Sequence, residues 1–245
     1  MAEAARNQLY LTFKNLLASG KFSDLTVTCG PDSYKVHKNV VCSRAEFFSR
    51  AVKFGGKETE QGSVDLPEDE PAIVKLMMQY IYEGEYDPAL PDNELGGSTK
   101  ITVPPTPTPP HKKSRVARQM FVPATPTSFP HSSLPIPGTS TQLMVHAKLY
   151  EIADKYDVVG LKELVIEKFK RACHSFWNDP SFANAAHHVF STTPEHDKGL
   201  RDIVSKTIAE HMAELVKKPE VEALLTEFNG LAFGLLKMKT EAGWK

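Results

Sequence analysis

Cysteine, net charge and long apolar runs are all scarce in this 245-residue sequence. The three cysteines, Cys29, Cys42 and Cys173, are odd in number and irregularly spaced, so they do not suggest a disulfide framework. Reduced, mostly buried thiols are expected instead, as in a protein of the cytoplasm or nucleus. A formal net charge of −1 provides no general attraction for nucleic acid. No apolar run approaches the ~18 residues of a membrane span, and the N-terminal residues do not resemble a signal peptide, so we expect no membrane partner.

Motifs that carry catalysis or hold cofactors are also missing. The stretch GGKET at 55–59 lacks the earlier glycine of a phosphate-binding loop and the Ser or Thr directly after its lysine. A zinc site built from Cys173-His174 and His187-His188 is disfavoured, because it offers a single cysteine, and adjacent histidines on a helix point in different directions. We therefore predict no enzyme, no cofactor and no metal.

Hydrophobic spacing in the N-terminal third predicts a mixed α+β fold. A helix is expected over 6–20, followed by strands at 24–29 and 34–37 around a turn at 30–33. Two short helices at 40–45 and 45–53 and a strand at 63–66 come next. Asp69 and Glu70 precede Pro71, which is typical of a helix start, and that helix is expected to end at about Tyr82.

The composition changes sharply after Pro88. Ten of the 34 residues from 104 to 137 are proline, so this stretch cannot bury enough apolar surface to offset its ordering cost. We expect residues 88–142 to be a disordered or polyproline-like insert. Thr106, Thr108 and Thr125 each precede proline and are candidate sites for proline-directed phosphorylation. A plain solvated spacer is the alternative.

Helical patterning resumes at Leu143. A helix pair is expected over 143–172, and an all-α extension over 173–245 with helix starts at the three X-Pro steps Asp179-Pro180, Thr193-Pro194 and Lys218-Pro219.

This order of elements, together with a set of short motifs, resembles the BTB/POZ domain. The matching motifs are Ser23-Asp24, Val36-His37-Lys38 with Val40-Val41, Ser43, Phe47-Phe48, Tyr80 to Tyr86, Ala153 to Tyr156 and Leu161-Lys162. The sequence from Leu66 to Pro71 is similar to that of fungal members of the family. The resemblance covers 5–87 and 143–172, and implies a small three-stranded sheet flanked by a helical cluster. The expected divisions are an N-terminal dimerisation helix (1–21), the core (22–87), the insert (88–142), the closing helix pair (143–172) and the helical extension (173–245).

The resemblance implies a non-enzymatic adaptor that homodimerises through its first helix. The implied interface residues are Leu9, Phe13, Leu16, Leu17, Asp24 and Lys38. The first four form a helical stripe that could instead pack on its own domain. For Asp24 and Lys38, two interpretations remain open. They form a contact at the floor of the dimer groove, or Asp24 makes an ordinary salt bridge or accepts hydrogen bonds from nearby backbone amides. His37 is expected to be structural.

Some members of the family recruit a cullin-type ubiquitin ligase scaffold, which makes a substrate adaptor the first alternative. The candidate cullin-facing residues are Val74, Lys75, Met78 and Tyr82. The recruiting pattern has Glu where this chain has Leu76, which weakens that alternative. A transcriptional co-regulator that recruits partner peptides into the dimer groove is the second alternative, without direct contact to nucleic acid.

Overall fold

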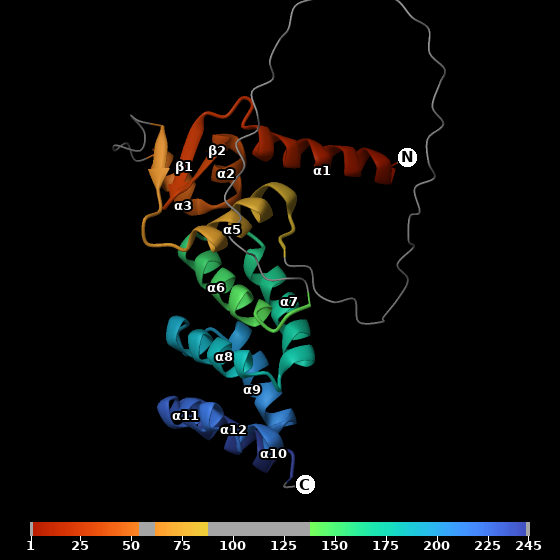
Figure 1. The fold of residues 1–245 in the computed structure, drawn as a ribbon, viewed down its shortest axis with the longest axis vertical. Coiled ribbons are helices and arrows are strands. Elements are labelled where there is room, and N and C mark those ends of the chain that lie inside the picture. Colours follow the sequence, from red (N-terminus) through yellow and green to blue (C-terminus); the bar gives the residue numbers. More distant parts are fainter. Residues whose placement is uncertain (1, 54–61, 88–137, 244–245) are drawn as a thin grey trace, which may run out of the picture. The chain divides into compact units, whose positions relative to one another are not determined.

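A three-stranded sheet begins the fold in the computed structural model, which describes residues 2–53, 62–87 and 138–243. Strand β1 (Leu25–Cys29) lies between β2 (Asp32–Val36), with which it pairs antiparallel, and β3 (Ser63–Asp65), with which it pairs parallel (Figure 1). The hairpin loop is shorter than predicted, because Cys29 already pairs with Asp32. Gly30 has a φ of 53° and precedes a proline, which suits the first position of a tight hairpin turn.

Among the described residues, four helices accompany this sheet in the first part of the chain. They are α1 (Ala2–Ser19), α2 (Lys38–Arg44), α3 (Glu46–Lys53) and α5 (Pro71–Glu83). Helix α1 ends at Gly20, whose N–H donates to the Leu16 carbonyl at 2.9 Å and whose φ is 61°. Helix α5 is buried on nearly all sides, since α1 and α2 pack against it as well as the later helix α6.

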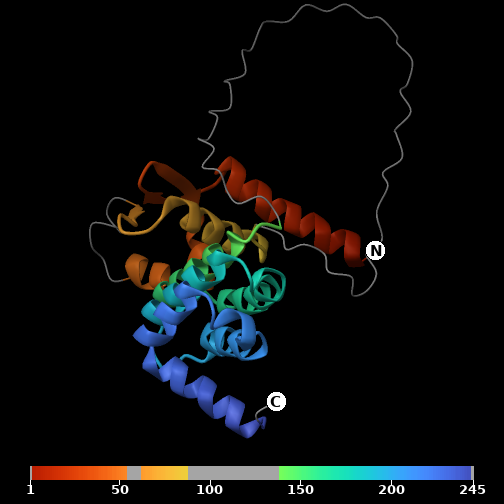
Figure 2. The same ribbon diagram turned by 60° about the horizontal axis from the view of Figure 1, so that its bottom comes forward.

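The remaining helices form three stacked hairpins. The first consists of α6 (Gln142–Lys155) and α7 (Leu161–Phe176), and the second of α8 (Pro180–Thr192) and α9 (Gly199–Glu210). A short helix α10 (Met212–Leu215) leads to the third, α11 (Pro219–Glu227) and α12 (Asn229–Glu241). Each hairpin packs on the next, as Figures 1 and 2 show, so the extension is built like a short repeat array.

Two predicted helix boundaries in the extension are wrong. The helix expected at Thr193-Pro194 begins at Gly199, because the Asp197 carboxylate accepts the Gly199 N–H at 3.1 Å and the Arg201 guanidinium binds the Thr193 carbonyl. The last predicted helix is two helices, divided at Phe228, whose ψ of 76° is not helical.

The buried apolar side chains form one continuous cluster that runs from the sheet to α12. Helix α6 packs directly on α5, and Ala45 forms an antiparallel bridge with Val158 beyond the end of α6. The Tyr156 hydroxyl donates to the Asp69 carboxylate in the loop before α5. Helices α6 and α7 therefore complete the core that the sheet and α5 begin.

Candidate interaction surfaces

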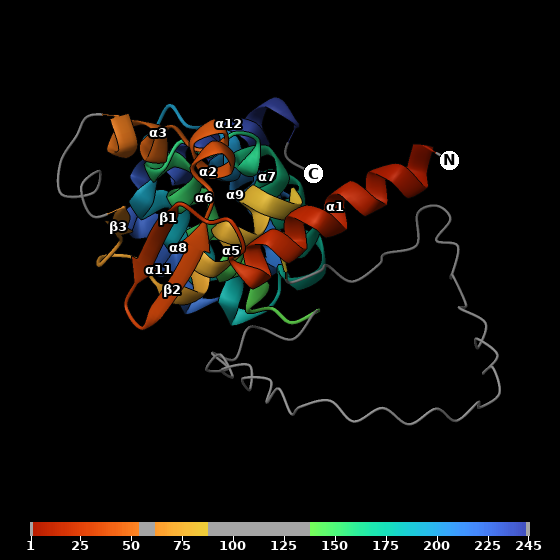
Figure 3. The ribbon, with the colours of Figure 1, turned by 90° about the horizontal axis from the view of Figure 1, so that it is seen from above.

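The N-terminal half of α1 is exposed to solvent, and its Tyr10 hydroxyl reaches Glu83 at the end of α5. Every residue from 4 to 12 is exposed, and Leu9 and Leu11 are 58% and 48% exposed. Figures 2 and 3 show these turns extending beyond the neighbouring helices. In the second half of α1, Phe13, Leu16 and Leu17 pack partly against the core. The helical stripe is therefore divided: its C-terminal part packs on its own domain, and Leu9 does not.

A single carboxylate holds α1 against the end of α5. Glu83 accepts hydrogen bonds from the Tyr10 hydroxyl at 3.0 Å and from the Lys14 ammonium at 3.1 Å. The Glu83 side chain is only 7% exposed, so the two donors replace water that it has lost. This contact joins residues about seventy positions apart, and the sequence pattern contains no signal for it.

The turn between α1 and β1 exposes a large aromatic side chain that the sequence pattern did not mark. Phe22 is 89% exposed, and its φ of 63° lies in the left-handed region that an aromatic residue rarely adopts.

The contact between Asp24 and Lys38 joins a side-chain carboxylate to a backbone amide and is not an ion pair of two side chains. The Asp24 carboxylate accepts the Lys38 backbone N–H at 2.7 Å, and no ion pair between the two side chains occurs among the described residues. Asp24 thus satisfies one of the free N–H groups at the start of α2, where a negative charge is also favourable. Of the alternatives for this carboxylate, the hydrogen bond to a backbone amide is the one present.

His37 is a structural residue that ties three segments together. Its backbone N–H donates to the Tyr82 hydroxyl at 2.8 Å, and its Nδ1 lies 2.8 Å from the same oxygen. Its Nε2 lies 2.7 Å from the Lys21 carbonyl, which can only accept, so we assign the ring proton to Nε2 and let Tyr82 donate to Nδ1. Burial raises the pKa of Tyr82 to about 12, so the phenol keeps its proton at neutral pH.

Three of the four residues predicted to face a cullin are inaccessible. Val74, Met78 and Tyr82 are buried inside their own chain, because α5 has neighbours on both sides. Lys75 alone is exposed. Helix α5 therefore offers a partner one lysine at these positions and no apolar contact.

A buried polar cluster lies where the chain leaves α5 and where it enters α6. The Tyr86 hydroxyl lies 2.9 Å from Nδ1 of His146, and the Lys168 ammonium donates to the Tyr86 carbonyl at 2.6 Å. Lys168 also pairs with Glu85 and lies 4.0 Å from the centre of the Tyr86 ring. Burial, with a further contribution from Lys168, lowers the pKa of His146 to about 3.

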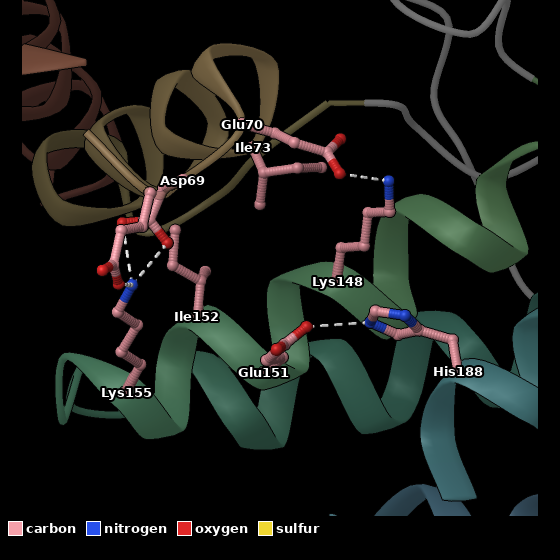
Figure 4. Close-up of a pocket in the computed structure, with 9 residues that line it drawn as sticks. Asp69, Glu70, Ile73, Lys148, Glu151, Ile152, Lys155 and His188 are labelled. Atoms are coloured by element: carbon pink, nitrogen blue, oxygen red, sulfur yellow. Dashed lines mark hydrogen bonds and ion pairs between the residues drawn. The ribbon is translucent and has the colours of Figure 1, made fainter. Parts of the chain in front are cut away.

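A pocket of about 340 Å³ opens between the N-terminal end of α5 and helices α6 and α8 (Figure 4). Its lining residues are Glu68, Asp69, Glu70, Ile73, Lys148, Glu151, Ile152, Lys155 and His188.

Three lysine–carboxylate ion pairs and one histidine–carboxylate contact surround this pocket. Lys155 lies 3.0 Å from Asp69 and 3.8 Å from Glu68, and a second lysine, Lys148, pairs with Glu70. The histidine contact joins α8 to α6, since Nε2 of His188 lies 2.9 Å from Oε2 of Glu151. The sequence pattern did not bring these residues together.

Other predicted features fall elsewhere. Thr106, Thr108 and Thr125 lie outside the described residues. Among the described residues, no group of three or more His, Cys, Asp or Glu side chains is arranged to hold a metal ion. The helices in this part of the chain are also too short or too polar to cross a bilayer.

Residues 13–95 match the family model of the BTB/POZ domain. The match begins within α1 and takes in the sheet, α2, α3 and α5. The chain thus contains a BTB/POZ domain, with its small sheet and helices, followed by a helical C-terminal region. The fold class expected from the sequence is confirmed.

Proposed function

We propose that this chain is a non-enzymatic adaptor that forms a homodimer through α1 and offers its other surfaces to partner proteins. BTB/POZ domains are in general protein-interaction modules, which supports the coarser part of this proposal. The observation that supports homodimerisation through α1 is the exposure of its N-terminal half, including Leu9 and Leu11, to solvent.

Free-standing helical turns of this length are unstable in water. Residues 4–12 span about 13 Å of helix at 1.5 Å per residue, and isolated helices of fewer than about 12 residues are marginal. Burying a leucine side chain contributes roughly 1.5–3 kcal/mol. A partner that covers Leu9 and Leu11 therefore stabilises the helix as well as the contact.

A second copy of the chain suits this surface. Leu9 and Leu11 lie about 200° apart around the helix, so a partner must contact two sides of α1. A twofold arrangement of two α1 helices would bury the side that carries Leu9 on both copies, and Leu11, on the other side of α1, would need a further part of the partner chain. Phe22, in the turn that follows the same helix, is also exposed.

The test is a double substitution, Leu9→Asp with Leu11→Asp, examined by sedimentation velocity. We expect a dimer for the wild type and a folded monomer for the variant, because neither side chain packs on its own domain. Asn178→Asp with Asn184→Asp adds the same charges at exposed polar positions outside α1 and should leave the dimer intact. A monomeric wild type at about 50 µM, well above the µM range in which specific complexes form, would refute the proposal.

The ligase-adaptor and co-regulator alternatives have less support. A cullin would meet Lys75 on α5 without the neighbouring apolar side chains, although the helical hairpins after α5 could supply further contacts. A groove around Asp24 would present a carboxylate already bonded to the Lys38 amide. Co-purification of the full chain with a cullin scaffold separates the first alternative from the proposed adaptor role.

A further inference from the structure

The pocket between α5, α6 and α8 has an apolar base. Ile73 and Ile152 are both buried, and Figure 4 shows them between the Asp69–Lys155 and Glu70–Lys148 ion pairs. A base of this kind suits the methylene stem of a long charged side chain, which packs on apolar surface while its head remains among polar groups.

The rim of the pocket has unused acceptor capacity. Three carboxylates each have one oxygen in contact with a lysine or histidine nitrogen, and their second oxygen has no hydrogen bond or ion pair among the described residues: Glu68, Glu70 and Glu151. Glu68 is the most open of them, with a side chain that is 86% exposed.

The charges of the lining do not balance. Four carboxylates face two lysines, so the lining carries −2 when His188 is neutral (−4 plus 2). The surplus negative charge favours a cation. A guanidinium suits this rim better than an ammonium, because its several N–H groups can donate to two separate carboxylates at once and because it is more weakly hydrated.

We propose that this pocket binds an arginine side chain from a linear segment of a partner protein. The stem would lie on Ile73 and Ile152, and the guanidinium would bond the free oxygens of Glu68 and Glu151. The proposal rests on the interaction function proposed above, but not on dimerisation.

The location of the pocket is compatible with a dimer built on α1. Helix α1 is anchored to Glu83 at the C-terminal end of α5, whereas the pocket begins at Glu70 and Ile73 at the other end. The 13-residue length of α5 separates the two sites by about 20 Å at 1.5 Å per residue. One chain could therefore dimerise and bind the arginine segment at the same time.

The test uses a fluorescein-labelled nonapeptide of Gly and Ser residues with Leu-Arg-Leu at its centre, measured by fluorescence anisotropy with the full chain. Matched peptides carry citrulline or lysine in place of arginine. We expect saturable binding of the arginine peptide, weakened about tenfold or more by Glu68→Gln or Glu151→Gln, since each removes a charged hydrogen bond. Glu222→Gln, on the exposed surface of α11, should leave binding unchanged.

Equal binding of the citrulline or lysine peptide would overturn the proposal, as would unchanged binding by both pocket variants. Circular dichroism checks that Glu151→Gln is folded, and Glu68→Gln changes a side chain that is 86% exposed. Sedimentation velocity on the same samples keeps the two proposals apart. A dimer that does not bind the peptide refutes only the pocket, and a monomer that binds it refutes only the dimer.

Discussion

Substitution of His146 by glutamine should make the protein less sensitive to acid. The His146 side chain is fully buried, and its Nδ1 lies 2.9 Å from the Tyr86 hydroxyl. Burial, reinforced by the nearby Lys168 charge, lowers its pKa from 6.5 to about 3. The folded protein therefore resists protonation of a residue that the unfolded chain protonates readily.

The sign and size of the effect follow from this difference. Between pH 6.5 and about 3, the unfolded chain binds a proton at His146 that the folded chain does not, so the free energy of unfolding falls as the pH falls. At 1.36 kcal/mol per pH unit, lowering the pH to 5 costs about 2 kcal/mol. For a protein of this size, that corresponds to a decrease in Tm of about 4–8 °C.

The assay is thermal unfolding of the wild type and His146→Gln at pH 7.5 and pH 5. The wild type should lose about 2 kcal/mol more than the variant between the two pH values, because the effects of all other titrating groups cancel in the comparison. His174→Gln, on the exposed side of α7, should behave as the wild type does. If His146→Gln loses as much stability as the wild type, the burial argument is wrong.

Further substitutions test the local geometry. Gly20→Ala should destabilise the fold by more than the ~1–2 kcal/mol that a left-handed conformation costs, since the new Cβ would lie 2.7 Å from Cβ of Lys35. Gly84 is also left-handed but has open space around it, so Gly84→Ala should destabilise the fold by about that ~1–2 kcal/mol and no more. Equal losses of unfolding free energy in urea titrations would contradict the steric argument. Tyr82→Phe should cost roughly 1–3 kcal/mol, because it leaves two buried His37 groups without their partner, and an unchanged midpoint in the same titration would show that the hydroxyl is dispensable.

Amphipathic periodicity predicted most of the elements but not what covers them. The stripe from Leu9 to Leu17 marks α1 as a helix with one apolar face. Only the structure shows that Phe13, Leu16 and Leu17 pack on the core while Leu9 stands free. The reason is that a helix presents the same stripe whether its own domain or another chain covers it.

For helix α5, the prediction that one side of the helix faces a partner protein is wrong. Val74, Met78 and Tyr82 were assigned to a partner-facing side, yet α5 is apolar on nearly all sides and is enclosed by α1, α2 and α6. A helix of that composition belongs to the interior. This apolar composition on all sides is already present in the sequence of residues 71–83.

Local chemistry is what the sequence by itself determined about this protein. The proline at the start of α5, the glycines after α1 and α5, and the alternation in β1 act over a few residues, because they depend on backbone preferences. The family resemblance, carried by ordered short motifs, supplied the fold class in the same way.

Tertiary structure alone decided which distant groups meet. The bonds from Tyr10 to Glu83 and from Tyr86 to His146, and the ion pairs around the pocket between α5, α6 and α8, join residues 37 to 87 positions apart. Such contacts follow from how whole helices dock, and docking sums many small apolar contacts that no single residue reveals. Both proposed interaction sites arise from that docking: the exposed half of α1 and the arginine pocket.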